Sequence, residues 1–451
     1  MAKKNSMRYV CSNCGSVFAT WMGRCANCGE WNTLNEQIDA GASLKAGGRV
    51  VAGQAVASVA AGEAFKRLRS GIPDVDEVLG GGIVPGSMIL IAGQPGIGKS
   101  TLLLQLAHSA AAATNVLYIS GEESAHQIGL RADRLGAGHK NLQIATSTSA
   151  NDIATTIAGG AHNLVVVDSI QTMSVAEVTS AAGSVTQITN STQLIMAAAK
   201  QSDTAVILVG HVTKEGSIAG PKVLEHVVDV VLQLEGDRYG GFKLLRSIKN
   251  RFGSTNEAAI FEMTDSGLQI VDNPSAALLA ERQVSDGSIV LATMEGSRPV
   301  LVEVQALVST TSYGYPKRTA SGFDLNRLNL LVAVLERRTK LNLSDKDVYI
   351  NIVGGIKITE PAADLAVCMA IASASKGMQL KKDAVVFGEV GLSGEVRHVP
   401  FADKRAAEAK KLGFTLSIGP MTYISGRAKK DNFTTSVRDV RSALNQFLEK
   451  D

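Results

Sequence analysis

Residues 93–100 constrain the fold more than any other stretch of this sequence. They read Gly-Gln-Pro-Gly-Ile-Gly-Lys-Ser, which matches the pattern GxxxxGKS. An apolar run with strand character, Met88–Ala92, comes directly before them, and an apolar run with helix character, residues 101–113, follows. A glycine loop between a strand and a helix lets successive backbone N–H groups point into one anion-sized hollow, at the positive end of the helix. The sequence therefore predicts a phosphate-binding loop rather than an ordinary glycine-rich turn.

The residue types in this loop suit a nucleoside triphosphate. The Lys99 amine would reach the outer phosphates, and the Ser100 hydroxyl would be a ligand of Mg²⁺. We therefore expect ATP and Mg²⁺ as cofactors. The residues predicted to bind the nucleotide are Gly93, Gln94, Pro95, Gly96, Ile97, Gly98, Lys99, Ser100 and Thr101.

Two CxxCG turns lie near the start of the chain. Cys11 and Cys14 belong to the first turn, and Cys25 and Cys28 belong to the second. Four thiolates at this spacing predict a structural Zn²⁺ site with no open position for chemistry. Two disulfides are the alternative, which a reducing compartment disfavours. Tryptophans and basic residues nearby leave open whether this module contacts nucleic acid or only solvent.

Length and composition favour a multidomain protein of the cytoplasm. The chain has 451 residues, of which 45% are hydrophobic and 19% are charged, as in globular proteins of about three domains. The N-terminus has no apolar stretch behind its charges, and no run approaches the ~20 apolar residues of a membrane span. We therefore expect no membrane partner. Because the net charge is only +3, contacts with nucleic acid would depend on local basic patches.

Four segments follow from the changes in pattern along the chain. Strand-like and helix-like runs alternate between residues 66 and 271, which predicts an α/β domain with a mostly parallel sheet, helices on both faces and ligands at the carboxyl ends of the strands. The predicted segments are a zinc module at 1–35, a flexible linker at 36–65, an ATPase domain at 66–271 and a second domain at 272–451. The strand-like runs are Met88–Ala92, Val116–Ile119, Leu164–Val167, Ala205–Val209, Val228–Leu234 and Lys243–Ile248.

Polar residues follow three of these runs, where ligands would bind. Asp168 has the position expected of a carboxylate that holds Mg²⁺. Glu122 or Glu123 would activate the water that attacks the γ-phosphate, with capping of the next helix as the alternative. His211 would either contact the γ-phosphate or be a satisfied polar residue at a strand end.

Several motifs together resemble known families. The segment Gly71–Gly82, the loop at 93–100, the segment Ser120–Ser124 and Asp168 resemble RecA-type ATPases. The run Lys249-Asn250-Arg251-Phe252-Gly253, with the four-cysteine module and the C-terminal domain, resembles the RadA (Sms) family of bacterial DNA-repair proteins over essentially the whole chain. The resemblance implies that Glu122 is the catalytic glutamate. It also implies a homo-oligomeric ring, with a hexamer expected.

The Lys-Asn-Arg-Phe-Gly segment also has a physical interpretation. Lys249 and Arg251 are two apart on a strand-like run and would share one face. In a ring they would project into the neighbour's nucleotide site, where such a cation can contribute ~10³–10⁵ in rate. A basic strand end before a turn is the alternative.

Two polar loops, at 173–192 and 213–222, are predicted to line the ring and to bind DNA. Lys214 and Lys222 would contact phosphates, while backbone and hydroxyl groups would supply contacts without sequence preference. Surface loops with no partner are the alternative.

The C-terminal segment has α+β character. Strand-like runs at Val300–Leu307 and Val348–Ile352 flank an amphipathic helix-like stretch at 324–339, and residues 388–396 resemble the proteolytic domain of Lon. Where that family has its nucleophilic serine, this chain has Pro361-Ala362-Ala363-Asp364, so Ser–Lys proteolysis is not available. Lys404 and Arg405 stand near the place of the catalytic lysine. We expect this domain to help to build the ring and to offer basic surface.

These observations lead to one expected function. The chain would be a DNA-dependent ATPase motor of recombination and repair, which binds single-stranded DNA and processes branched intermediates. A RecA-type recombinase is a further expected partner. The alternative is a protein-remodelling ATPase related to Lon without peptidase activity.

Overall fold

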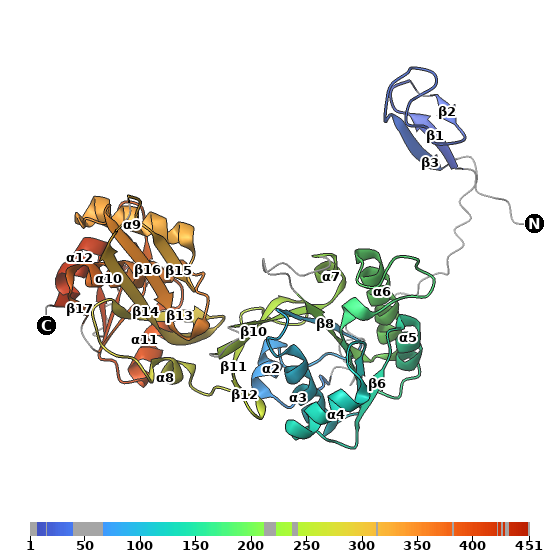
Figure 1. The fold of residues 1–451 in the computed structure, drawn as a ribbon, viewed down its shortest axis with the longest axis horizontal. Helices are drawn as coiled ribbons and strands as arrows, with labels where there is room; N and C mark the ends of the chain where they lie inside the picture. The colour runs from blue at the N-terminus through green and yellow to red at the C-terminus, as the bar shows by residue number, and fades with distance from the viewer. Residues whose placement is uncertain are drawn as a thin grey trace, which may run out of the picture. The chain divides into compact units, whose positions relative to one another are not determined.

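The structure is a computed structural model, and its contacts divide the chain into two compact units, Met1–Glu63 and Ala64–Asp451 (Figure 1). The described residues are 7–14, 16–38, 66–211, 222–236, 242–312, 314–380, 383–421, 423–424, 427–428 and 433–449. Most of the predicted linker therefore lies outside them.

The first unit is a small antiparallel ribbon. Strands β1 (Met7–Cys11), β2 (Val17–Phe18) and β3 (Leu34–Ile38) pair in the order β2-β1-β3. Its buried hydrophobic residues are Cys11, Cys25 and Leu34. Because β3 pairs with β1 as far as Ile38, residues 36–38 belong to the ribbon in the structure. A core this small needs a further constraint to fold.

The α/β part of the second unit is built on a nine-stranded sheet in the order β12-β11-β10-β9-β4-β8-β7-β5-β6. The six strands from β9 to β6 are parallel, and β10 to β12 continue the sheet as antiparallel strands. The strands are β4 (Met88–Gly93), β5 (Val116–Ser120), β6 (Leu142–Thr146), β7 (Leu164–Asp168), β8 (Ala205–His211), β9 (Val230–Gly236), β10 (Phe242–Asn250), β11 (Ala258–Thr264) and β12 (Gly267–Ile270). All six predicted strand-like runs are confirmed.

Helices cover both faces of this sheet (Figure 1). Apolar side chains of α3 and α4 pack on one face, and those of α5 and α6 pack on the other. The helices are α2 (Pro73–Val78), α3 (Lys99–Ala111), α4 (Ala125–Arg134), α5 (Ala150–Ala158), α6 (Val185–Ser202) and α7 (Lys222–Val227), with a 3₁₀ turn η2 (Ile170–Thr172). The predicted class, an α/β fold with a RecA-like P-loop core, is confirmed.

Helix α6 corrects one prediction about the polar loops. The predicted loop at 173–192 ends at Ser184, whose side chain accepts a hydrogen bond from the Gln187 N–H and caps the helix. Inside α6, the hydroxyls of Thr189 and Thr192 donate to carbonyls one turn earlier. Polar side chains that bond to their own helix backbone therefore resemble a loop in composition. Of the loop at 213–222, only Lys222 is described, as the first residue of α7.

The C-terminal part of the second unit has a seven-stranded sheet in the order β15-β16-β14-β13-β18-β21-β24. These strands are β13 (Ser288–Glu295), β14 (Arg298–Thr310), β15 (Arg318–Ser321), β16 (Lys346–Ile352), β18 (Ala384–Val386), β21 (Leu416–Gly419) and β24 (Thr434–Ser436). The helices are α8 (Pro274–Leu279), α9 (Leu325–Thr339), α10 (Asp364–Lys376), α11 (Ala402–Lys411) and α12 (Val440–Phe447), with turns η3 (Val353–Gly355) and η4 (Pro361–Ala363). Short pairs are formed by β17 (Gln379–Leu380) with β25 (Leu448–Glu449), β19 (Glu389–Val390) with β20 (Val396–Arg397), and β22 (Tyr423–Ile424) with β23 (Arg427–Ala428). The two predicted strands and the helix at 324–339 are confirmed, and Cys368 is buried in α10.

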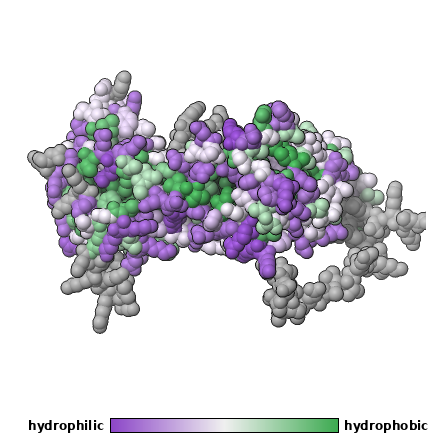
Figure 2. Space-filling model, turned by 90° about the horizontal axis from the view of Figure 1, so that it is seen from below, coloured by the Kyte–Doolittle hydropathy of each residue, from purple (hydrophilic) through white to green (hydrophobic). Residues whose placement is uncertain are grey.

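The molecular surface carries no extended apolar band in the view of Figure 2, where hydrophobic residues form limited groups among hydrophilic ones. Within the described ranges, no helix has the length and apolar character that crossing a bilayer requires.

Candidate nucleotide site and metal centre

The predicted phosphate-binding loop joins β4 to α3. Gly96 and Gly98 have φ angles of 78° and 111°, a region that side chains rarely adopt. A Cβ atom on Gly98 would lie 2.8 Å from the Met263 side chain, whereas one on Gly96 would meet nothing within 4 Å. The loop is therefore closely packed at Gly98 and open at Gly96, where a ligand can approach the backbone.

Lys99 lies beneath this loop with only 4% of its surface exposed. Its Nζ donates hydrogen bonds to the carbonyls of Gly93 at 2.9 Å and Gln94 at 3.0 Å, and lies 3.1 Å from Nδ1 of His211. Burial lowers the pKa of Lys99 to about 8, against the opposing charges of Asp168 and Glu122. Lys99 is thus a buried cation held where the strand, the loop and the carboxylates meet.

Asp168 ends strand β7 and is 6% exposed. Its Oδ2 accepts a 2.6 Å hydrogen bond from the hydroxyl of Tyr118, a residue of β5. An anionic carboxylate beside the loop, together with the Ser100 hydroxyl, is the oxygen donor set that Mg²⁺ prefers. The residues present therefore fit a nucleotide-bound Mg²⁺.

The two glutamates after β5 have different partners. Ser169 donates its hydroxyl hydrogen bond to Oε1 of Glu122, and Nε2 of His211 lies 3.5 Å from the same oxygen. Glu123 instead forms an ion pair with Arg131. Helix α4 is capped by neither, because Ser124 and Gln127 form a reciprocal capping box. Neither glutamate therefore supplies the side-chain cap of α4, and Glu122 instead contacts Ser169 and His211.

Lys99, Glu122, Asp168 and His211 thus converge at the carboxyl ends of β4, β5, β7 and β8. Sequence reasoning found these four but missed Tyr118 and Ser169. The signal for Tyr118 was strand alternation, since Tyr118 and Ser120 share a face of β5 just as Val166 and Asp168 share a face of β7.

Lys249 and Arg251 do not join this cluster. Nζ of Lys249 donates to the carbonyls of Glu225 at 2.6 Å and Val228 at 2.8 Å, and Arg251 forms a 3.1 Å ion pair with Asp229. A register shift lies between Ser247 and Lys249, and β10 ends at Asn250. Both side chains nevertheless contact the segment 225–229, and the charge of Arg251 acts on Lys249, so the two lie near each other. Their place in a neighbour's nucleotide site stays a prediction.

The cations at 249 and 251 lie at the far end of the sheet from the nucleotide loop. Asp229, the partner of Arg251, also accepts a 3.0 Å hydrogen bond from the Met88 N–H, at the first residue of β4. The nucleotide loop follows the last residue of β4, roughly 16 Å away at the usual rise per residue. Within one chain, these cations cannot contact the nucleotide site.

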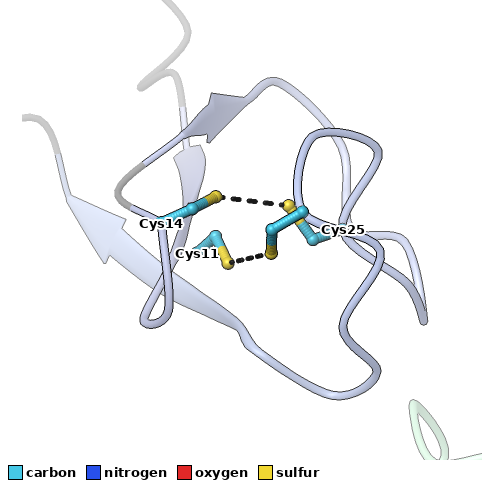
Figure 3. A group of neighbouring side chains, drawn as sticks. Cys11, Cys14 and Cys25 are labelled. Atoms are coloured by element: carbon cyan, nitrogen blue, oxygen red, sulfur yellow. Dashed lines mark hydrogen bonds between the residues drawn. The ribbon is translucent and has the colours of Figure 1, made fainter.

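The four N-terminal cysteines form a compact cluster (Figure 3). Sγ of Cys11 is 3.6 Å from Sγ of Cys28, and Sγ of Cys14 is 3.6 Å from Sγ of Cys25. All four sulfurs lie within 4.8 Å of one another. Disulfide sulfurs are about 2.05 Å apart, whereas tetrahedral Zn–S bonds of about 2.3 Å place sulfurs about 3.8 Å apart. The cluster fits one metal ion, and hydrogen bonding with Ser16 lowers the pKa of Cys14 to about 6, which favours the thiolate that a metal needs.

The segment that the sequence resemblance aligned with the Lon serine is buried. Ala362 and Ala363 are buried, and Asp364 is fully buried and paired with Arg327. Arg405 is 1% exposed and pairs with Glu360, whereas its neighbour Lys404 is exposed. Arg405 therefore adds nothing to the basic surface expected of this domain.

Three family models match parts of the chain. An AAA domain matches residues 57–217, a rubredoxin metal binding domain matches residues 9–36, and subunit ChlI of Mg-chelatase matches residues 329–422. The first covers the nucleotide loop, Glu122 and Asp168, and the second covers all four clustered cysteines. The motifs and the geometry thus agree with independent family matches.

Relatives match over almost their full lengths. A DNA repair protein RadA of Listeria monocytogenes is 48% identical over 99% of this chain and 100% of its own length. The protein of the same name from Pseudomonas aeruginosa is 46% identical over 100% of both chains. That from Escherichia coli is 43% identical over 99% of both chains. With its P-loop core and four-cysteine ribbon, this chain belongs to the DNA repair protein RadA family.

Proposed function

We propose that this chain is a DNA-stimulated ATPase of DNA repair, which works as a homo-oligomeric ring on single-stranded and branched DNA. The observation that supports this most is the convergence of Lys99, Glu122, Asp168 and His211 at one edge of the sheet. A scaffold that only binds nucleotide has no need of a carboxylate positioned beside the loop.

Each of these residues would have its own role in ATP hydrolysis. Lys99 neutralises the outer phosphates, and Asp168 and Ser100 hold Mg²⁺, which would offset the charge that develops on the phosphate oxygens. Glu122 accepts the proton of the attacking water. Ser169 and His211 both contact Oε1 of Glu122 and so hold that carboxylate in one place.

The distance between the two ends of the sheet supports the proposed ring. Lys249 and Arg251 are too far from their own nucleotide loop to act there, so any nucleotide that they serve would belong to a neighbouring subunit. A closed ring, expected to be a hexamer, gives every site such a neighbour. Light scattering on the protein with and without nucleotide measures the subunit number.

Steady-state ATP hydrolysis with and without single-stranded DNA tests the function. We expect DNA to stimulate turnover and Lys99→Ala to abolish it, with exposed Lys140→Ala as the matched lysine control. An ATP hydrolysis rate that does not change when DNA is added would favour the protein-remodelling alternative. ATP binding without turnover would contradict both.

Lys214 and Lys222 are the proposed contacts to DNA phosphates. Replacing both with alanine should weaken DNA stimulation and leave the DNA-free rate unchanged, because neither residue is assigned a role in hydrolysis. DNA affinity at several salt concentrations checks this, since loss of phosphate contacts also lowers the salt dependence.

A further inference from the structure

Tyr118 stands directly below the carboxylate that we assign to Mg²⁺. Its side chain is fully buried, and its hydroxyl donates a 2.6 Å hydrogen bond to Oδ2 of Asp168. Strands β5 and β7 are parallel neighbours, with Tyr118 beside Val166 and Ser120 beside Asp168. The aromatic ring of Tyr118 therefore lies in the core against the sheet. Its hydroxyl reaches along the strand direction to the edge of the nucleotide site.

Packing alone does not explain a hydroxyl at this position. The neighbours of Tyr118 on this face of the sheet include Val116, Leu164 and Val166. Phenylalanine would fill the same volume among them, and it would need no hydrogen-bond partner. A buried hydroxyl is stable only where a partner is fixed in place. Here that partner is a functional carboxylate rather than a backbone group.

Charged groups surround the phenol. Asp168 faces it from β7, Glu123 from the turn before α4, and Arg131 from α4. Because Glu123 and Arg131 form an ion pair with each other, Asp168 is left as the partner that accepts the hydrogen bond of the phenol.

We infer that Tyr118 is a positioning residue for metal-dependent nucleotide binding, which fixes the rotation of the Asp168 carboxylate by holding Oδ2. With Oδ2 held by this bond, Oδ1 would be the oxygen that serves the metal. This role rests on the proposed function, because it needs Asp168 to serve Mg²⁺. Hydrogen bonds to metal ligands from outside the coordination sphere typically change metal affinity 10- to 100-fold in proteins, so a single lost bond has a measurable effect.

Nucleotide binding measured against free Mg²⁺ concentration tests this role without requiring turnover. The probe is a fluorescent ADP analogue, titrated into the full chain and into the Tyr118→Phe variant. We expect the half-saturating Mg²⁺ concentration to rise about tenfold in the variant. Affinity in the presence of EDTA should be unchanged, because the nucleotide loop and Lys99 are intact. Tyr349→Phe, in β16 of the C-terminal sheet, is the matched control and should shift neither value.

Two results would overturn the role of Tyr118. An unchanged half-saturating Mg²⁺ concentration would show that the Tyr118 hydroxyl serves only the stability of the core and not metal binding. Equal weakening with and without metal would mean that the substitution distorts the whole site, which a lowered melting temperature would accompany. If the unsubstituted chain binds nucleotide with no Mg²⁺ dependence at all, the assignment of Asp168 fails, and the proposed function fails with it.

Discussion

Lys99 is a buried amine that would contact the phosphates of a bound nucleotide. We therefore expect nucleotide binding to depend on pH. Burial lowers its pKa to about 8 in the protein without nucleotide, and bound phosphates would raise it again. We expect binding to take up a proton between pH 8 and the ordinary lysine range near 10.4. Affinity should fall as pH rises through this interval. Stability of the free protein should rise there, because the unfolded chain binds more protons than the folded one.

Calorimetric titration of nucleotide at about pH 9, in buffers of different ionisation enthalpy, measures that proton uptake. Lys99→Arg is the control, because its guanidinium stays charged throughout. Proton uptake that persists in the arginine variant would place the titrating group elsewhere.

Glu122 and Glu123 offer a matched pair of adjacent carboxylates. Glu122→Gln should lower the ATP hydrolysis rate by about 10²–10⁴, while nucleotide binding is retained, because the amide keeps the shape but cannot accept a proton. Glu123→Gln should have a much smaller effect, since Glu123 faces Arg131 and not His211. Single-turnover hydrolysis with both variants measures the difference, and equal losses would contradict the assignment of Glu122.

The sequence indicated the site residues best where a polar or charged residue follows a buried strand, because the strand end then fixes the position of that residue. Lys99, Glu122 and Asp168 each follow a buried strand, so the fold brings them to one edge. The sequence did not reveal that Ser169 and His211 share one oxygen of Glu122, because a hydrogen bond between side chains from different strands has no local signal. Arg405 shows the opposite problem, because a charge in a basic run suggests exposure, whereas this side chain is buried and pairs with the partly buried Glu360.

Among the elements, the N-terminal ribbon depends most on its metal. Three buried residues form its core, so removing the ion should unfold residues 7–38 and leave the second unit intact. Both tryptophans of the chain, Trp21 and Trp31, lie in this ribbon. Tryptophan fluorescence during chelation therefore reports on the ribbon alone, and circular dichroism reports on the rest. An unchanged emission after complete metal loss would contradict the prediction.

The metal itself can be identified at the same time. Four thiolates accept Zn²⁺ or iron, and the rubredoxin match does not decide between them. We predict one Zn²⁺ per chain, which elemental analysis measures and which leaves the protein colourless. Cys25→Ser should lower the metal content, whereas Cys368→Ser, in the buried helix α10, should not.

Helix α11 contains two adjacent basic residues with opposite environments. Arg405 donates to the Ala292 carbonyl and to both oxygens of Glu360, whereas Lys404 is exposed. Arg405→Ala should destabilise the C-terminal part by about 3–5 kcal/mol, because it leaves the partly buried Glu360 without its charged partner. Lys404→Ala should stay within about 0.5 kcal/mol. Denaturant unfolding distinguishes the two, and similar values for both would show that the Arg405 network contributes little.

Elements with an apolar period were predictable, and polar elements were not. Six of the nine strands of the nucleotide-binding sheet were found from sequence as mainly apolar runs, whereas β6, β11 and β12 were not. The first turns of α6 are rich in Ser, Thr and Gln, and their helical state depends on the Ser184 cap and on hydroxyl bonds to the helix backbone. Such bonds stabilise turns as readily as helices, so composition alone does not decide between them.

At the scale of the whole molecule, the proposed ring predicts that two inactive variants rescue each other. Lys99→Ala removes a phosphate contact but retains Arg251, and Arg251→Ala does the reverse. Mixed rings would contain sites with both residues intact, so mixing should restore part of the ATPase activity. Mixing Lys99→Ala with Glu122→Gln is the control, because both of these residues serve their own chain's site. Absence of rescue, with mixed oligomers confirmed, would place Arg251 outside the site.

The packing of strand β4 has a consequence for the order in which the subunits of such a ring would hydrolyse ATP. It is buried along its whole length and hydrogen-bonded to β8 and β9 on either side. One end opens into the phosphate loop of its own chain, and the other is tied through Asp229 to Arg251. A strand so tightly packed shifts as a rigid piece. In a ring where Arg251 contacts the nucleotide of the next subunit, each β4 strand would couple ATP hydrolysis in one site to hydrolysis in the next. The subunits would then hydrolyse ATP in sequence instead of at random.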